Sequence, residues 1–457
     1  MQRRPNILLI HCHDLGRHLA CYGAKTVNSP RLDWLSARGV TAERMFASAP
    51  QCSPSRASLF TGRWPHSNGV MGLTHADFAW DLHEGERHLA SRLHEAGYHT
   101  ELIGVHHESR VKDDASIAQD LGFDSVRTGG AAPEVAERTN SALDRLAAHD
   151  QPFYLQVGFH EPHRIPGRQD PPGIQGFIGD HMEPDDSLGV EIPPYLRHDA
   201  SAREEIAELQ GAIRCMDAGV GQILDRLDAL GLTDDTLTLF TTDHGLALPR
   251  AKCSLYDPGL EVAFIAHWPG GGWTGGRRLT DLLANVDVVP TLLEALDLTE
   301  GEAAPRIQGR SFLGLLDGRE DAEGRTEIFG ELTYHDYYDP RRCVRTERYK
   351  LIANFSSAPG FMDPSQSWQH RCTAVDAGLG HEDYHPSVEL YDLHADPVEL
   401  DNLAERPELT PVRAELLAQL TAWMQEGSDP LLHGAVAGPL HHRTMDALRA
   451  PHTEAGS

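Results

Sequence analysis

Short apolar runs alternate with stretches of helical periodicity along the first half of the chain, and this alternation restricts the fold more than any other feature. The apolar runs cover residues 6–10, 99–105, 153–158 and 236–241, and the helical stretches cover residues 31–39, 87–96 and 203–230. Strands that alternate with helices form βαβ units, which stack into a mostly parallel sheet covered by helices. The sequence therefore predicts an α/β fold with one large, mostly parallel mixed sheet sandwiched by helices.

A different pattern begins near residue 326. Strand-like segments cover residues 326–332, 343–355 and 388–393, and an amphipathic helix follows over residues 410–426. These strands have no helices between them, so they predict a small antiparallel sheet with one packed helix. We expect a large domain over residues 1–335 and a smaller C-terminal α+β domain over residues 336–457, and a chain of 457 residues can fill both.

Histidines and aspartates follow directly after the predicted strands. They are His13, Asp14, His106, His107, His160, Asp243 and His244. The carboxyl ends of parallel strands lie at one edge of a sheet, and ligands bind there. We therefore expect these side chains to meet in one site.

The net charge argues against two classes of partner. The chain has 40 Lys and Arg against 68 Asp and Glu, a formal net charge of -28, which repels nucleic acid and anionic membranes. The apolar run near the N-terminus covers only about five residues, far fewer than a signal peptide or a membrane span needs. We expect a cytoplasmic protein that binds neither nucleic acid nor membranes.

The most specific motif of the chain is the run QCSPSRASLFTG at residues 51–62. One interpretation is a buried structural cysteine, Cys52, ahead of a helix that Ser53 or Ser55 caps. The pattern Cys-x-Pro-x-Arg, extended to the Thr-Gly pair that ends the run, instead resembles the signature of the sulfatase family of the alkaline phosphatase superfamily. The resemblance covers almost the whole chain and is strongest with bacterial sulfatases that are similar to sulfamidase (heparan N-sulfatase). It implies the alkaline phosphatase-like fold.

The resemblance implies that a formylglycine-generating enzyme oxidises Cys52 to the aldehyde formylglycine. A hydrated aldehyde has two hydroxyls: one attacks sulfur, and the other then collapses to expel sulfate, which a serine could not do. Arg56 would hold the hydrated aldehyde and the developing negative charge with its planar guanidinium.

The resemblance also implies one divalent cation that has the formylglycine made from Cys52 among its ligands. Matching positions assign it to Asp14, Asp243 and His244, with His13 in place of the aspartate that the family usually has there. The family default is Ca²⁺, but imidazole ligands favour a borderline metal such as Mn²⁺ or Zn²⁺.

Three further positions match groups that bind sulfate in the family. His160 matches a histidine that contacts the sulfate or protonates the leaving group, and His163 in the same run is a candidate substrate contact. Lys252 matches the lysine on the sulfate oxygens.

One family position departs from the pattern. The family has Gly-Lys-x-His where this chain has Gly104-Val105-His106-His107, so a lysine at the site is replaced by valine. His107 keeps the histidine position and, as an imidazolium, could replace the lysine as leaving-group acid, with His106 as the substitute substrate contact. Asn68 is a candidate oxyanion donor or a turn residue.

The sequence thus predicts a metal- and formylglycine-dependent hydrolase of a small anionic sulfated substrate, a sulfated sugar or similar ester or N-sulfate. Two alternatives stay open: a phosphonate monoester or phosphodiester hydrolase, which the Asp243-His244 pair resembles, and a catalytically silent binding homologue. The sequence leaves the metal, the exact substrate and a homo-oligomeric state open.

Overall fold

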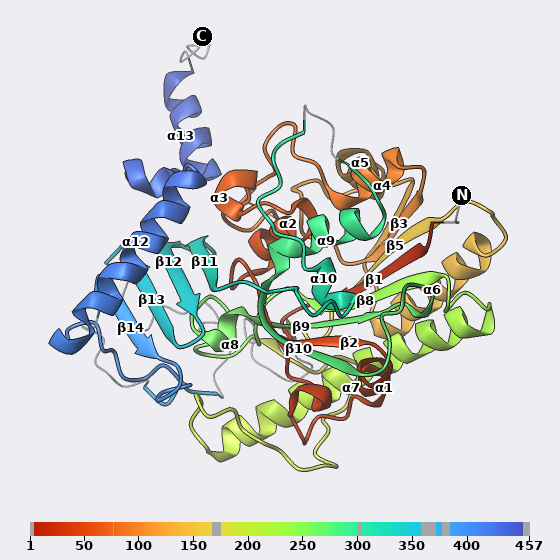
Figure 1. Cartoon of the computed structure of the whole chain (residues 1–457), viewed down its shortest axis with the longest axis horizontal. Helices are drawn as coiled ribbons and strands as arrows, with labels where there is room; N and C mark the ends of the chain where they lie inside the picture. The colour runs from red at the N-terminus through yellow and green to blue at the C-terminus, as the bar shows by residue number, and fades with distance from the viewer. Residues whose placement is uncertain are drawn as a thin grey trace, which may run out of the picture.

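A computed structural model describes residues 4–75, 77–166, 175–299, 304–357, 372–376 and 384–450. It contains a large eight-stranded sheet and a separate four-stranded sheet. Figure 1 shows the large sheet between layers of helices on the right and the small sheet beneath one long helix on the left. The predicted division into an α/β part and a smaller α+β part is confirmed.

The large sheet has the order β10-β2-β9-β8-β1-β5-β3-β4. Its predicted strands are β1 (Asn6–Cys12), β3 (His99–Gly104), β5 (Phe153–Phe159) and β8 (Thr236–Thr242). The strands that the sequence analysis did not identify are β2 (Val40–Phe46), β4 (Ser125–Thr128), β9 (Glu261–His267) and β10 (Arg277–Ala284). Only β9 pairs antiparallel with its neighbours β2 and β8 within this sheet as described, so the sheet is mixed and mostly parallel.

Strand β1 shows how the sheet is buried on both faces. Leu8 and Ile10 belong to one apolar core, whereas Ile7 and Leu9 belong to another, because successive side chains of a strand point to opposite faces. The first core lies against α1 (Pro30–Arg38), α6 (Ala132–Leu146) and α7 (Ala200–Ala229). The second lies against α2 (Cys52–Thr61), α4 (Leu89–Glu95), α5 (Asp114–Leu121) and α9 (Val288–Ala295).

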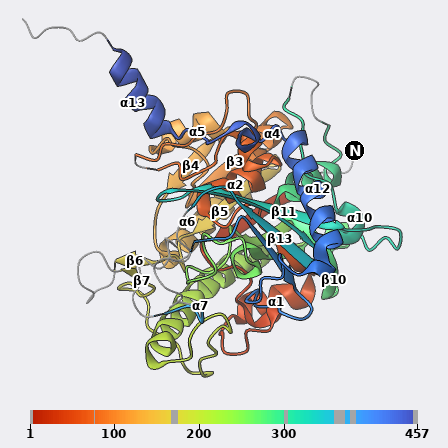
Figure 2. The same ribbon diagram turned by 90° about the vertical axis from the view of Figure 1, so that its left-hand side faces the viewer.

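The small sheet is antiparallel and has the order β11-β12-β13-β14. Its strands are β11 (Glu327–Tyr334), β12 (Tyr338–Thr346), β13 (Tyr349–Asn354) and β14 (Val388–Asp392). Helix α12 (Thr410–Glu426) packs on it, with the Trp423 ring stacked on the Phe329 ring at 4.9 Å, and Figure 2 shows the helix lying across these strands.

Two details differ from the sequence prediction. The predicted strand over residues 343–355 is a hairpin, because the polar pair Glu347-Arg348 forms a turn between β12 and β13. The predicted domain boundary after residue 335 falls in the hairpin between β11 and β12. Since β11 pairs with β12, the small sheet begins at Glu327.

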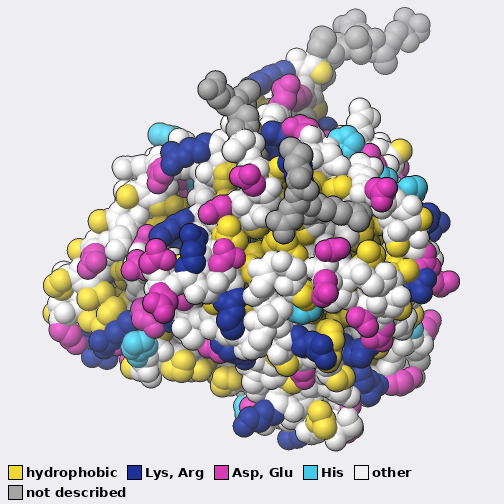
Figure 3. Space-filling view, turned by 45° about the vertical axis from the view of Figure 1, so that its right-hand side comes forward, with side chains coloured by type: hydrophobic (Ala, Val, Ile, Leu, Met, Phe, Trp, Pro, Cys, Tyr) yellow, Lys and Arg dark blue, Asp and Glu magenta, His cyan; other side chains and the backbone are white. Residues whose placement is uncertain are grey.

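The remaining elements are short or peripheral. They are α3 (Pro65–Asn68), β6 (Ile165–Pro166), β7 (Gln175–Gly176), α8 (Asp257–Leu260), α10 (Leu313–Leu316), α13 (Pro439–Arg449) and the 3₁₀ turns at Ala20–Tyr22, Pro269–Gly271, Asn285–Asp287, Pro407–Leu409 and Pro430–His433. Over the described ranges, every helix is too short or too polar to cross a bilayer. Acidic and basic side chains are interspersed on the face that Figure 3 shows.

Candidate active site

The Cys52 thiol lies at the first position of helix α2, buried beneath the edge of the large sheet. Its Sγ atom is 3.3 Å from His244 Nε2 and 3.9 Å from Asp14 Oδ1. The backbone N–H groups of a helix N-terminus have no partner within the helix and favour negative charge. A nucleophile or an anion at residue 52 is therefore stabilised by α2 itself.

The alternative interpretation made Ser53 or Ser55 a helix cap, but Gln51 is the residue at the N-cap position of α2. Ser53 Oγ is 3.2 Å from Thr74 Oγ1, and Ser55 Oγ donates a hydrogen bond to the Asp243 carbonyl. Asn285 Nδ2 in turn donates to Ser55 Oγ at 2.9 Å and its Oδ1 accepts from Ser48 N–H at 3.0 Å. These bonds fix the start of α2 against the end of β8, and sequence reasoning missed Asn285 because no motif surrounds it.

Two aspartates from neighbouring strands face the thiol. Asp14 follows β1 and Asp243 follows β8, and the Asp14 N–H donates to Asp243 Oδ1 at 2.9 Å. Lys252 Nζ is 2.9 Å from both Asp14 oxygens. Burial raises the pKa of Asp14, but Lys252, His163 and His244 outweigh it and hold that pKa well below its usual value. Both the carboxylate and the ammonium are therefore charged.

Arg56 is held by the other side of this network. Its Nε donates to Asp243 Oδ2 at 3.2 Å, its Nη1 to His11 Nδ1 at 2.6 Å and its Nη2 to the Cys12 carbonyl at 3.3 Å. Burial and then Arg56 lower the pKa of His11, so a neutral imidazole accepts this bond. No sequence pattern places His11 in the site, because only the fold brings it into contact with Arg56.

Three imidazoles gather around that of His13. Its ring centroid is 4.9 Å from that of His107, 5.2 Å from that of His163 and 5.7 Å from that of His160. Nδ1 of His13 is 3.0 Å from Asp243 Oδ2. The fold thus brings together the residues that follow β1, β3, β5 and β8, as the sequence predicted.

The donors around Cys52 suit a divalent cation. Nδ1 of His244 donates to the Gly245 carbonyl at 2.9 Å and Nδ1 of His163 to the Arg164 carbonyl at 2.6 Å. Each ring therefore turns its Nε2 toward Asp14, at 3.1 Å and 3.7 Å, which is how histidine ligands of metals are usually oriented.

Two overlapping donor groups result. One has ligand atoms from Asp14, Cys52, Asp243 and His244 within 4.8 Å of one another, and the other combines His13, Asp14, Cys52 and His163. The buried His13 Nε2 has no hydrogen-bond partner among the described residues, which also fits a missing ligand bond. His163, predicted as a substrate contact, thus lies among the candidate metal donors.

His106 and His107 lie on different sides of the chain after β3. The chain turns at Gly104, whose φ of +92° and close approach to the Gly158 carbonyl admit only glycine. The His107 carbonyl accepts from Thr74 Oγ1 at 3.1 Å, and its ring stacks on His75 at 5.6 Å and faces His13. Burial lowers the pKa of His106; Arg56 also lowers it, while Glu108 and a hydrogen bond to the backbone of Val111 act in the opposite direction. A substrate contact for His106 stays a prediction, and His107 is the one of the pair whose ring lies against His13.

The predicted imidazolium at His107 differs from the charge state that this environment favours. Burial, Arg56 and His75 hold the pKa of His107 well below its usual value. Burial also lowers the pKa of His160 and lowers that of His163 to about 3. These shifts favour the neutral form of all three rings, and an anion close to His107 would raise its pKa.

Asn68 lies away from the Cys52 thiol. Its Nδ2 donates to the Arg63 carbonyl at 3.1 Å and its Oδ1 accepts from the Val70 N–H at 2.9 Å. Nδ2 also reaches Thr61, which lies about 13 Å along α2 from Cys52 at 1.5 Å per residue. Asn68 is a buried turn residue, which agrees with the second of the two interpretations that the sequence left open.

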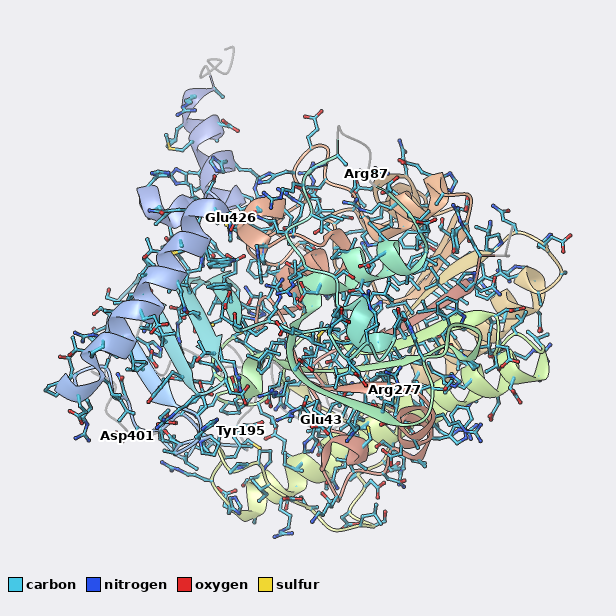
Figure 4. All side chains as sticks on the ribbon, in the orientation of Figure 1. Glu43, Arg87, Tyr195, Arg277, Asp401 and Glu426 are labelled. Atoms are coloured by element: carbon cyan, nitrogen blue, oxygen red, sulfur yellow. The ribbon has the colours of Figure 1, made fainter. Side chains whose placement is uncertain are left out.

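A cavity of about 680 Å³ lies beside this site. Its lining includes Leu15 and Leu246, which lie in the loops after β1 and β8. It also includes Glu43 and Tyr195, both labelled in Figure 4. Among the described residues that line it, none belongs to the group around Cys52. The cavity is therefore separate from the thiol.

Comparisons with known proteins agree with this architecture. Residues 5–298 match the family model described as Sulfatase, and residues 248–362 match the model described as N-sulphoglucosamine sulphohydrolase, C-terminal. The chain is 28% identical to human N-sulphoglucosamine sulphohydrolase, over 94% of this chain and 91% of that protein. It is 27% identical to an ulvan-active sulfatase of Formosa agariphila, over 96% and 84%.

Solved structures show the same fold. A structure from Bacteroides fragilis described as a sulfatase has a TM-score of 0.72 at 19% identity and covers 96% of this chain and 99% of its own. Another, in complex with D-glucosamine-2-N,6-O-disulfate, has a TM-score of 0.69 at 17% identity and covers 93% and 98%. Because the Sulfatase model matches well over half of the chain, this protein belongs to the sulfatase family and is a hydrolase of sulfate esters or N-sulfates.

Proposed function

We propose that this chain releases sulfate from a sulfated amino sugar, with a preference for the N-sulfate, and that its nucleophile is formylglycine made from Cys52. The observation that carries the proposal is the position of Cys52, at the N-terminus of α2 and within 3.9 Å of both Asp14 and His244. The substrate class rests on the relative that cleaves N-sulphoglucosamine and on the matching C-terminal model.

One divalent cation would be held by Asp14, Asp243 and His244, with His13 and His163 as adjacent donors. When bound, the cation would withdraw negative charge from the sulfate oxygens and from residue 52. Mixed imidazole and carboxylate donors favour Mn²⁺ or Zn²⁺ over Ca²⁺, which prefers six to eight oxygen ligands.

The protein's own groups divide the remaining work. The Lys252 ammonium, fixed by Asp14, offers positive charge to a sulfate oxygen. His107 and His160 flank His13, and either imidazole can pass a proton to the departing nitrogen or oxygen once the bound anion has raised its pKa. Arg56 keeps Asp243 ionised and in place.

The proposal is tested with protein co-expressed with a formylglycine-generating enzyme. Intact peptide mass spectrometry should show the Cys52 peptide converted to the aldehyde, and sulfate release should scale with the converted fraction. Full activity of unconverted protein would contradict the mechanism. Cys343→Ser, at a second buried cysteine that lies in strand β12 of the small sheet, is the matched control for Cys52→Ser.

Substrate class is tested by comparing turnover of N-sulfoglucosamine, an O-sulfated glucosamine, an aryl sulfate and an aryl phosphonate with Mn²⁺, Zn²⁺ or Ca²⁺. We expect the highest kcat/KM for N-sulfoglucosamine. The highest value for the phosphonate would favour the phosphonate hydrolase alternative instead. Binding of all four compounds without turnover by converted protein would favour the silent homologue.

A further inference from the structure

A second group of metal-type donors lies outside the site described above. It combines Glu161, His181 and Cys215, whose ligand atoms all lie within 4.8 Å of one another. The three residues come from separate segments: Glu161 from the loop after β5, His181 from the segment after β7, and Cys215 from the middle of α7. A carboxylate, an imidazole and a thiol are the side chains that bind Zn²⁺ in proteins.

The contacts of Glu161 leave one of its oxygens available. Oε1 accepts the Ala132 N–H at the start of α6 at 2.8 Å and lies 2.8 Å from His181 Nε2. Oε2 is buried and has no hydrogen-bond partner among the described residues, although the Glu161 residue is only 3% exposed. A buried carboxylate oxygen without a partner costs free energy unless a cation or a donor reaches it.

We propose that Glu161, His181 and Cys215 form a second Zn²⁺ site that fastens the loop carrying His160 to helix α7. The half-exposed His181 gives a path from solvent, and water can take the fourth position of a tetrahedral Zn²⁺. On binding, His181 changes tautomer by exchange with solvent, so that Nδ1 carries the ring proton and Nε2 binds the metal instead of donating to Glu161, and the Cys215 thiol releases its proton to solvent.

The donor set also separates this site from the one at Cys52. Burial, followed by Glu161, raises the pKa of Cys215 to about 11, so the free thiol is protonated and a thiophilic metal is needed to displace the proton. Thiolate ligands select Zn²⁺ and its substitute Co²⁺ over Ca²⁺ or Mg²⁺. Since Glu161 adjoins His160 in the chain, occupancy of the second site would restrain the catalytic loop.

The test uses Co²⁺ with the full chain carrying Cys52→Ala, so that the thiol of the first site cannot contribute. We expect a thiolate-to-cobalt charge-transfer band that saturates at one Co²⁺ per chain, and competition of Zn²⁺ for the same band. Adding Cys215→Ser should abolish the band, and His181→Ala should weaken Co²⁺ binding more than about tenfold, since losing an outer-shell partner alone costs about 10- to 100-fold.

Two matched controls accompany these variants. Cys21→Ser removes another half-buried thiol. His198→Ala removes an exposed histidine that lies, like His181, between β7 and α7. Both variants should leave the band unchanged. A band that survives Cys215→Ser, or no band in correctly folded Cys52→Ala protein, would overturn the proposal. Because this background releases no sulfate, the outcome does not depend on the proposed reaction.

Discussion

The Lys252 ammonium lies 2.9 Å from both carboxylate oxygens of Asp14, and the two charges are fully buried. Asp14 also faces His244, His163 and the Cys52 thiol. The Asp14 carboxylate therefore faces two kinds of positive charge, a fixed ammonium and the candidate metal, which compete for it. Removing Lys252 should lower activity without weakening metal binding, so the two roles can be measured separately.

Lys252→Ala should lower kcat/KM about 10²- to 10³-fold, the usual effect of removing one preorganised donor to a developing charge. The same variant should bind the divalent cation at least as tightly as the wild type, because Asp14 loses a competing positive charge. Lys252→Arg should recover part of the activity. Isothermal titration with Mn²⁺ and steady-state kinetics check both effects, and weaker metal binding by Lys252→Ala would contradict this account.

Asp243→Asn should abolish both metal binding and activity. The Asp243 carboxylate accepts from Arg56 Nε and from the Asp14 and His244 N–H groups, so the amide also leaves the buried Arg56 charge without its partner. Breaking a buried ion pair in this way costs about 3 to 5 kcal/mol. Elemental analysis and urea unfolding measure the two losses.

The matched control for that variant is Asp235→Asn, an exposed aspartate just before the opposite end of β8. It should keep the metal, the activity and the unfolding midpoint. Metal at full stoichiometry in Asp243→Asn would remove Asp243 from the site.

Much of the fold could be predicted because it depends on local pattern. The apolar runs of β1, β3, β5 and β8 are buried on both faces, which leaves a continuous hydrophobic signal. Strand β2 escaped notice because its middle is Glu43-Arg44, two charged residues that lie half-exposed near the edge of the sheet.

The candidate site was predictable only where residues follow strands or match a motif. Cys52 matches a motif, and Asp243 both follows a predicted strand and matches a family position. His11, Asn285 and the pairing of Lys252 with Asp14 depend on contacts between residues more than 40 positions apart, and no local pattern records such contacts. For Asn68 the sequence left two interpretations open, because a turn amide and an oxyanion donor have the same sequence signal, and its hydrogen bonds are those of a turn residue.

His107→Ala should lower turnover about 10²- to 10⁴-fold, and most for substrates with poor leaving groups, whereas His106→Ala should stay near the wild type. The reason is orientation: the His107 ring faces His13 and His75, and His106 contacts the backbone near Val111. Equal losses in the two variants would contradict this assignment.

The pH dependence of kcat and kcat/KM should also reflect the protonation of His107. Burial and Arg56 lower the pKa of His107 in the free protein, and a bound sulfate raises it. If the imidazolium donates the proton, kcat/KM should fall with rising pH earlier than kcat does, because kcat/KM reports the free enzyme and kcat the complex. Profiles for N-sulfoglucosamine and an aryl sulfate check this order.

Asp217 should make the protein's stability depend on pH between about 4 and 6. This side chain of α7 accepts the N–H groups of Arg31 at 3.0 Å and Leu32 at 2.8 Å, and so caps the start of α1 from outside that helix. Burial raises its pKa from 3.8 to about 6, against the effect of the two backbone bonds. The folded protein thus holds this proton more tightly than the unfolded chain does.

The sign of the effect follows from that difference in proton binding. The contribution of Asp217 to stability is fully present below about pH 4 and is lost as pH rises through about 6, by roughly 3 kcal/mol for a shift of about two units. Asp217→Asn removes the titration, so the free energy of unfolding of the wild type relative to this variant should fall between pH 4 and pH 7. Glu204→Gln, at an exposed position of α7, should leave the pH dependence unchanged. Urea midpoints measured across that range decide the matter: a difference between wild type and Asp217→Asn that is constant with pH would mean that Asp217 stays ionised, and acts only as a cap of α1.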